Sequence, residues 1–367
     1  MAIGTGTPQI KNLPVIPYVI NTNGFIDRTE HDTISKATAS PGSGAPWQQE
    51  LLAQGLLGRL MVQFQGQVVI ALGAGSATTT RHWPYGLLSS LALQVNGSTN
   101  LHQGNGEDFH ARRVATNPAW TVNNLDAFPG TVGGGDVLTS GTFGLTITWE
   151  IPVWTDPTSM AGMLYLQSIT NDVVINAFQE LTANLITLAG GATAVITGTY
   201  NVLSDLFSIP RNNEGAIILP EGVTRLHSFV FQETALTTAS GENTLTLTRN
   251  QQAQLMRLFV QVRASDTSIV QPIAADGRLN SIKIMYGSNH QPLFYDPAEF
   301  LTAINNQYYG VRLPYGYLCF DFVRENMRRD IVQLGGVPDF RIVPNVTLVI
   351  GANSGLRVVQ ETVYGVQ

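Results

Sequence analysis

The pentapeptide RLMVQ at residues 59–63 returns later in the chain as RLFVQ at residues 257–261. Both copies alternate apolar and polar side chains, the pattern of a β-strand with one buried face. Outward from this pair, further blocks match in the same order. Residues 86–93 match residues 277–284, and the turn at 97–98 matches the turn at 287–288. Three further matches follow in order: Phe109 with Phe300, residues 149–151 with 320–322, and the apolar hairpin at 188–200 with that at 349–364. A repeat of this length predicts two tandem domains of one fold.

The spacing of the blocks differs in one place. The span from Phe109 to Trp149 is about 20 residues longer than the span from Phe300 to Phe320, and it contains the glycine-rich sequence GTVGGG at residues 130–135. We therefore expect an inserted surface loop in the first copy. The predicted domain limits are an N-terminal arm at residues 1–50, a first β-domain at 51–205 and a second at 206–367.

The composition restricts the class of fold. Charged residues make up 13% of the 367 residues and hydrophobic residues 44%, with 36 glycines; a typical chain has about 25% charged residues. Disorder requires low hydrophobicity and high charge, and helical bundles are rich in Ala, Glu, Lys and Leu. The composition therefore predicts an all-β protein, and the low charge indicates a surface partly covered by neighbours.

Local patterns agree with an all-β fold that has few short helices. Alternating strand patterns occur at residues 59–65, 91–95, 146–153, 194–196 and 244–248. Short helices are predicted at residues 107–114, 156–166 and 297–305, the last with Asp296 as N-cap and Pro297 as first helical residue. Many short strands separated by glycine-rich turns are typical of sandwiches and barrels.

Charge and cysteine content exclude several roles. The net charge is −6, opposite in sign to the basic surface of a nucleic-acid-binding protein, so no sequence-specific nucleic-acid binding is expected. The single cysteine, Cys319, lies in an apolar run and is predicted to be a buried structural thiol. The longest nearly apolar stretch, residues 185–198, is shorter than the ~20 residues that cross a bilayer. Without a signal-peptide pattern at the N-terminus, we expect the protein to be made and kept in a cytoplasm until assembly or release.

Catalytic motifs are missing from the sequence. None of the three lysines completes a P-loop, and the sequence contains no Gly-x-Ser-x-Gly, His-x-His, His-Glu-x-x-His or EF-hand calcium loop. We therefore interpret the glycines at 130–135 as a flexible loop. We predict a protein that is not an enzyme, with no catalytic, cofactor-binding or metal-binding residues and no cofactor.

One acidic cluster has histidines nearby. Glu107 and Asp108 lie between His102 and His110, which permits a metal-binding or acid–base role. The interpretation that we favour is a capped, solvated helix start after the sequence GNG at residues 104–106. No role in catalysis is expected for these four residues.

Two other groups have alternative interpretations. Residues 324–330 contain Arg324, Arg328 and Arg329 with Glu325 and Asp330, which is either a solvated loop or a salt-bridged contact with a neighbouring subunit. The tryptophans are more typical of core or interface positions than of sugar-binding platforms: Trp83, Trp120, Trp149 and Trp154.

The blocks together resemble a known family. The sequences that carry the resemblance are GLLGRL at residues 55–60, PYGLLSSLALQVNG at 84–97, GYLCFDF at 316–322, FRIVPN at 340–345 and LRVVQETV at 356–363. Over roughly residues 50–365 they resemble the double jelly-roll major capsid proteins of tailless, membrane-containing (tectivirus-like) bacteriophages. The resemblance implies two tandem eight-stranded jelly-roll barrels.

The resemblance also implies a structural function. Such a protein forms homotrimeric, pseudo-hexagonal capsomers of an icosahedral shell and is found in the virion. Its partners would be neighbouring capsomers and minor capsid or vertex proteins, and the arm at residues 1–50 could contact an inner membrane. Two alternatives remain: a secreted or virion fibre or carbohydrate-binding β-sandwich protein, and a two-domain cupin-like enzyme, whose metal-binding His-x-His is missing from the sequence.

Overall fold

The computed structural model of the chain describes most of the sequence. The described residues are 27–29, 46–51, 55–97, 99–117, 134–155, 162–169, 172–207, 209, 214–217, 225–248, 252–265, 269–270, 277–287, 290–323, 332–337, 339–351 and 353–365. Several features singled out in the sequence lie outside the described residues. They are the remainder of the arm, Trp120, residues 130–133 of the glycine-rich loop, residues 156–161 of one predicted helix, and the charged segment 324–330.

The first half of the chain forms two facing four-stranded sheets. One sheet has the order β1 (Asp27–Thr29), β12 (Thr193–Phe207), β3 (Leu56–Ala71) and β8 (Gly141–Ile151). The other has the order β2 (Pro46–Leu51), β10 (Val173–Gln179), β5 (Leu88–Val95) and β6 (Thr99–Gly104). All pairings within these two sheets are antiparallel. Numbered along the chain, the eight strands follow the orders 1-8-3-6 and 2-7-4-5, which define a jelly roll.

The second half repeats this arrangement strand for strand. One sheet has the order β13 (Arg225–Ala235), β22 (Gly355–Gly365), β16 (Ala253–Arg263) and β19 (Tyr317–Asp321). The other has the order β14 (Ser240–Glu242), β21 (Arg341–Leu348), β17 (Gly277–Tyr286) and β18 (His290–Tyr295). The predicted fold, two tandem eight-stranded jelly rolls, is therefore confirmed. The repeated pentapeptides lie on β3 and β16, the third strand of each jelly roll.

The shorter elements also recur. Helix α1 (Gly106–Thr116) and helix α3 (Glu299–Tyr309) each follow the fifth strand, as predicted. The predicted start of α3 is wrong, because the helix begins at Glu299 with Ala298 as its N-cap and has no side-chain cap from Asp296. β9 (Leu164–Tyr165) and β20 (Val332–Gln333) pair with the third strands, and each leads into a 3-10 turn, η3 (Leu166–Ser168) or η7 (Leu334–Gly336). The predicted helix at 156–166 is wrong where the structure describes it, because Leu164 and Tyr165 are in a strand.

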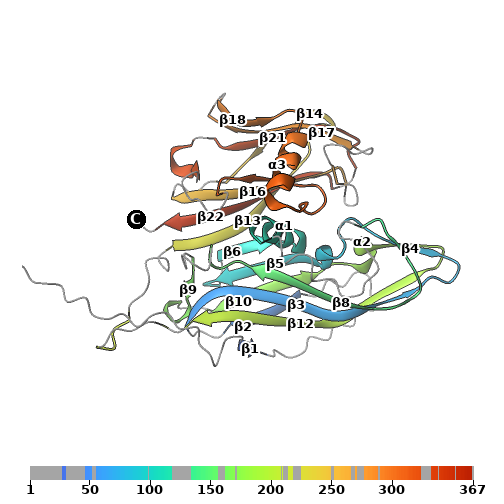
Figure 1. Cartoon of the computed structure of the whole chain (residues 1–367), viewed down its shortest axis with the longest axis horizontal. Helices are drawn as coiled ribbons and strands as arrows, with labels where there is room; N and C mark the ends of the chain where they lie inside the picture. Colours follow the sequence, from blue (N-terminus) through green and yellow to red (C-terminus); the bar gives the residue numbers. More distant parts are fainter. Residues whose placement is uncertain are drawn as a thin grey trace, which may run out of the picture.

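Three short strands and a short helix of the first jelly roll have no counterpart in the second, and they cluster at one end of the first jelly roll. β4 (Ser76–Thr79), β7 (Val137–Leu138) and β11 (Ile186–Ala189) form a small sheet, with helix α2 (Thr182–Leu185) beside it (Figure 1). β7 belongs to the connection between α1 and β8. This connection is longer than that between α3 and β19, as the spacing of the sequence blocks predicted.

The strand pairing bears on the predicted domain limits. β1 and all but the last residue of β2 lie within the predicted arm at residues 1–50, yet these strands pair with β12 and β10 of the first jelly roll. Trp47 on β2 is 4% exposed and stacks on Tyr200, at 5.4 Å between ring centroids. Residues 27–29 and 46–50 therefore contribute strands to the first barrel, and the independence of the remaining arm stays a prediction.

Alternation along each strand builds one core per jelly roll. On β3, buried Leu60, Val62 and Phe64 alternate with half-buried residues. On β22, Leu356 and Val358 point into the second core. The first core continues into the second jelly roll, because it includes Phe229, Phe259, Tyr317, Cys319 and Val359.

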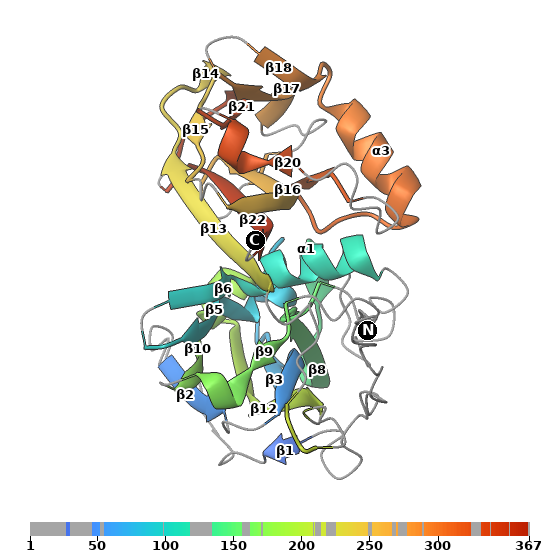
Figure 2. The same ribbon diagram turned by 90° about the vertical axis from the view of Figure 1, so that its left-hand side faces the viewer.

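The two jelly rolls share a sheet. β6 of the first pairs in parallel with β13 of the second, through His102 with Phe229 and Gln103 with Val230. This pairing continues the strands into one nine-stranded sheet. Figure 2 shows the two jelly rolls one above the other, with α1 between them. In the described part of the chain, no helix is both long and apolar enough to cross a membrane.

Candidate functional site at the junction of the two jelly rolls

Helix α1 is buried although it carries four charged residues. Glu107, Asp108, Arg112 and Arg113 are each at most 4% exposed. Charged side chains are almost never fully buried unless they are paired. The helix lies between the two jelly rolls (Figure 2), so that both supply partners for its charges. We call the resulting set of buried charged residues the junction network: Asp108, Arg112, His227, Arg257, Arg357 and Glu361.

The start of α1 is fixed by a capping box. The Asn105 side chain accepts a hydrogen bond from the Asp108 backbone N–H at 2.8 Å, and Asp108 Oδ2 accepts one from the Asn105 N–H at 2.8 Å. The reciprocal bonds satisfy two backbone donors that a helix start leaves open. They also fix the position of the Asp108 carboxylate at the surface of the second jelly roll.

Asp108 binds two residues of the second jelly roll. Arg357 on β22 donates from Nη2 to Oδ2 at 2.6 Å, and from Nε to the same carboxylate at 3.2 Å. The hydroxyl of Tyr317 on β19 donates to Oδ1 at 2.8 Å. Burial, followed by the charge of Asp108, raises the pKa of Tyr317 well above its ordinary value, so this phenol remains a donor. Two-point contact between a guanidinium and a carboxylate fixes angle as well as distance.

Glu361 on β22 is the second centre of the network. It is 0% exposed and is contacted by three basic side chains. Arg112 of α1 approaches Oε1 at 2.8 Å, and Arg257 of β16 approaches Oε2 at 3.0 Å. Burial alone would raise the pKa of Glu361, but Arg112 and Arg257 outweigh it and hold this pKa well below its usual value. The carboxylate is therefore ionised and holds the helix of one jelly roll to the sheet of the other.

The third partner of Glu361 is His227 on β13. Its Nε2 lies 3.0 Å from Glu361 Oε1, and its Nδ1 lies 2.7 Å from the carbonyl oxygen of Pro152. Both neighbours are hydrogen-bond acceptors, so the two bonds require a proton on each ring nitrogen. His227 thereby links the end of the first jelly roll to the network.

An aromatic row fills the space beside these charges. Phe109 of α1 lies 5.2 Å from Phe229 of β13, which lies 6.0 Å from Phe259 of β16, measured between ring centroids. All three are at most 1% exposed. The junction thus combines apolar packing with paired charges that admit one orientation of the two jelly rolls.

The cluster predicted around α1 is partly as expected. The capped helix start is found, but Glu107 and Asp108 are buried, so the expectation that they are solvated is wrong. The reason is that the second jelly roll covers them. His82 Nδ1 lies 2.8 Å from Glu107, whereas Asp108 binds Arg357. Among the residues that the structure describes, no group of three or more His, Cys, Asp or Glu side chains is placed to hold a metal ion.

The two histidines of this cluster are enclosed separately. His110 stacks on Tyr85, and burial, with a smaller contribution from Arg113, lowers the pKa of His110 to about 3. His102 on β6 lies edge-on to His227, at 5.3 Å between ring centroids. Burial, followed by the positive charge of His227, lowers the pKa of His102 well below its ordinary value. Both imidazoles are therefore neutral at physiological pH.

Other residues from the sequence analysis occupy core positions. Trp83 and Trp149 are each 1% exposed, as expected for core tryptophans. Trp154 is half-buried and packs against Phe207, at 5.4 Å between ring centroids. Cys319 is 0% exposed, which confirms a buried thiol, and burial raises its pKa.

The partners of α1 were missed in the sequence. Arg357 and Glu361 lie four residues apart in LRVVQETV, and the two-residue period of a strand places them on one face. Two charges on the same face of an otherwise apolar strand were the signal in the sequence that could have indicated a buried charged site. Their partners on α1, Asp108 for Arg357 and Arg112 for Glu361, are each 249 positions away in sequence, a separation that no local pattern bridges.

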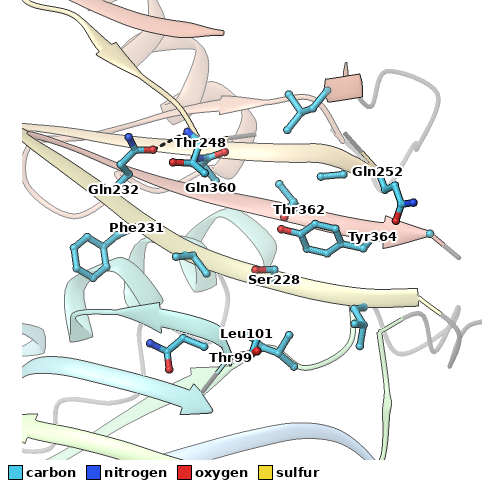
Figure 3. Close-up of a pocket in the computed structure, with 16 residues that line it drawn as sticks. Thr99, Leu101, Ser228, Phe231, Gln232, Thr248, Gln252, Gln360, Thr362 and Tyr364 are labelled. Atoms are coloured by element: carbon cyan, nitrogen blue, oxygen red, sulfur yellow. Dashed lines mark hydrogen bonds between the residues drawn. The ribbon is translucent and has the colours of Figure 1, made fainter. Parts of the chain in front are cut away.

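A pocket of about 610 Å³ opens at the end of the second jelly roll near the C-terminus (Figure 3). β13 contributes Ser228 and Gln232, β22 contributes Thr362 and Tyr364, and β6 contributes Leu101. These side chains present hydroxyl and amide groups beside apolar surface. Gln232 is held by the backbone of Thr246 and Thr248 at 2.8 Å each.

Comparison with known proteins gives matches in structure alone. No protein-family model matches the chain, and no curated protein matches by sequence. The STIV MCP, the major capsid protein of Sulfolobus turreted icosahedral virus, superposes with a TM-score of 0.64 at 15% identity, covering 91% of this chain and 97% of that one. A chain of the PBCV-1 virus capsid superposes with a TM-score of 0.52 at 13% identity, covering 90% of this chain and 92% of that one.

These matches extend over both jelly rolls and the junction between them. The fold of this chain is that of the double jelly-roll major capsid proteins of viruses. The resemblance found in the sequence is therefore confirmed at the level of fold, and a tectivirus-like type is consistent with it.

Proposed function

We propose that this protein is the structural major capsid protein of an icosahedral virus and forms homotrimeric, pseudo-hexagonal capsomers. The observation that carries the proposal is the junction network. It holds two copies of one jelly roll in a single orientation within a fold that matches viral capsid proteins over 91% of the chain. Each chain supplies a rigid pair of similar jelly rolls, so three chains supply the six that a pseudo-hexagonal capsomer requires.

The composition supports the same role. Only 13% of the residues are charged, and a surface of this kind suits a protein whose faces are covered by neighbouring copies. In this role the protein has no catalytic function. It is located in the virion, and its partners are other capsomers and minor capsid or vertex proteins.

The test is the mass and shape of the purified protein. Light scattering should give three times the chain mass of 39.7 kDa, about 119 kDa. Electron microscopy should show particles with a near-hexagonal outline that assemble into closed shells with the minor proteins. A monomer across a wide concentration range, or glycan binding by an isolated monomer, would contradict the proposal and favour the fibre or lectin alternative.

We also propose that the N-terminal arm acts in assembly, by contacting the adjacent capsomer or an inner membrane. Its sequence carries Pro14, Pro17 and an apolar segment at residues 13–20 that is too short to span a bilayer. Deletion of residues 1–22 stops short of β1. The truncated chain should keep its melting temperature and oligomeric state but fail to form shells. A truncated chain that does not fold would place these residues in the first barrel.

A further inference from the structure

A second pocket, of about 340 Å³, lies beside helix α3 of the second jelly roll. The helix ends at Gly310, whose left-handed conformation has a φ of 67°, and residues 312–316 then lead into β19 and form another part of the pocket wall. Asn305 holds the helix to β19, because its side chain makes two hydrogen bonds with the backbone of Cys319, at 2.8 and 2.9 Å. The pocket therefore has fixed walls and the size of a small-molecule site.

One part of the pocket lining is apolar. Val270, Leu279 and Leu318 line the pocket, belong to the core of the second jelly roll and are each at most 3% exposed. Leu313 and Pro314 add further apolar surface. This part of the pocket can accept a hydrocarbon or aromatic group, since the transfer of apolar surface out of water is favourable.

Helix α3 brings polar groups without partners to the same pocket. The Thr302 hydroxyl oxygen is buried, and no described residue forms a hydrogen bond with it. Buried polar groups that lack a partner are uncommon, and they cost free energy in the empty protein. Asn306, one helical turn further on, also lines the pocket, and its side-chain amide makes no hydrogen bond within the described part of the chain. Both side chains are therefore available to a ligand.

One positive charge at the pocket is not compensated. Arg312 lines the pocket, is exposed, and makes no ion pair with any described residue. Glu299 also lines it, but Arg278 Nη2 lies 3.6 Å from Glu299 Oε1 and balances that carboxylate. The two arginines and the glutamate leave a net charge of +1, which matches an anion with a single charge. A phosphate monoester has about two negative charges at neutral pH, so one of them would be unpaired beside Glu299.

We propose that this pocket binds a small amphipathic carboxylate, with its apolar group against Leu279 and Leu318 and its carboxylate on Arg312. A guanidinium and a carboxylate can form two parallel hydrogen bonds, which fix the orientation of the ligand. The Thr302 hydroxyl and the Asn306 amide supply further donors. A ligand bound in this way joins α3 to the segment before β19 and stabilises the second jelly roll by mass action. The site lies within one chain, so it does not depend on the proposed homotrimer.

The first experiment measures the binding of octanoate to the full-length protein by isothermal titration calorimetry, with octanamide as an uncharged ligand of the same length. Octanoate should bind about tenfold more tightly than octanamide, because only the carboxylate pairs with a guanidinium. Arg312→Gln should remove this preference. The matched control, Arg225→Gln, changes an arginine of β13 outside the pocket and should keep it. No binding of octanoate, or a preference that survives Arg312→Gln, would overturn the proposal.

The second experiment separates ligand binding from packing at Thr302. Thr302→Val keeps the shape of the side chain and removes a hydroxyl that has no described partner, so the melting temperature should be unchanged or higher. Octanoate affinity should nevertheless fall by about three- to tenfold. Thr79→Val is the matched control: Thr79 Oγ1 accepts a hydrogen bond from the Asp136 N–H at 3.1 Å, so this variant should melt at a lower temperature and bind octanoate as the wild type does. A lower melting temperature for Thr302→Val with unchanged octanoate affinity would show that the hydroxyl serves packing, and the assigned site would be wrong.

Discussion

Glu361 is enclosed by Arg112, Arg257 and His227, and no part of it reaches solvent. Buried ion pairs often add little net stability, because desolvation of the charges offsets their attraction. Removing one member is nevertheless costly, since the others remain buried without a partner. At the scale of the residue, the network therefore sets the orientation of the jelly rolls more than it adds to their stability.

The substitution Glu361→Gln tests this property. It should lower the free energy of unfolding by about 3–5 kcal/mol, because two arginines and a histidine lose their counter-charge. Glu242→Gln is the matched control, since Glu242 is half exposed and its pair with Lys283 is a surface salt bridge of about 0–1 kcal/mol. Urea denaturation of both variants measures the difference. Equal effects would show that the buried network has no special role.

His110 predicts a dependence of stability on pH. Its pKa is about 3 in the folded protein, against an ordinary value of 6.5, so below pH 6.5 the unfolded chain binds a proton that the folded chain does not. Stability should therefore be complete above pH 6.5 and fall by about 1.4 kcal/mol per pH unit towards pH 3. His102, whose pKa is also lowered, acts with the same sign.

The measurement compares the wild type with His110→Phe, which keeps an aromatic ring against Tyr85. Melting temperatures from pH 8 to pH 4 should fall less steeply for the variant, and the two profiles should run parallel above pH 7. Profiles of equal slope throughout would mean that His110 does not remain neutral in the folded protein.

At the scale of the element, helix α1 depends on a glycine at its first position. A Cβ atom at Gly106 would collide with the carbonyl oxygen of Tyr85 and the indole nitrogen of Trp149. Gly106→Ala should therefore destabilise the protein by about 1–3 kcal/mol through overpacking, although alanine is the better helix former. Gly144→Ala on β8 is the control, since a Cβ there meets open space. Thermal denaturation that ranks the two variants equally would contradict the close packing of α1.

The elements also show how far the sequence was informative. The alternation at residues 59–65 predicted β3, and the cap signal before residue 107 predicted α1, because local periodicity and capping act over a few residues. The cap signal at Asp296 placed the start of α3 too early, since the helix begins at Glu299 without a side-chain cap. The pattern at 244–248 predicted a strand, yet only Leu245 and Thr246 pair, with β21. Strand order depends on pairs such as Arg59 with Asp205, 146 positions apart, and it came from the family resemblance. The junction network was missed for the same reason.

At the scale of the whole molecule, the chain carries a natural probe in each jelly roll. The five tryptophans all lie between Trp47 and Trp154, and the single cysteine, Cys319, lies in the second half. Because the first core includes Phe229, Phe259 and Val359 of the second jelly roll, the two halves should unfold together. Tryptophan fluorescence and the reactivity of the Cys319 thiol should give the same urea midpoint. Separate midpoints would show that the jelly rolls unfold independently.

The pairing of β6 with β13 joins two jelly rolls that belong to one polypeptide. Tethered partners meet at an effective concentration in the millimolar range, however dilute the protein is. In the proposed homotrimer, a ring of six jelly rolls, three junctions are already formed, one within each folded chain, and only three form by collision between chains. The yield of complete rings depends on the third power of chain concentration instead of the sixth. In such a homotrimer, a fused pair of barrels therefore closes into rings at concentrations where single barrels would still be separate.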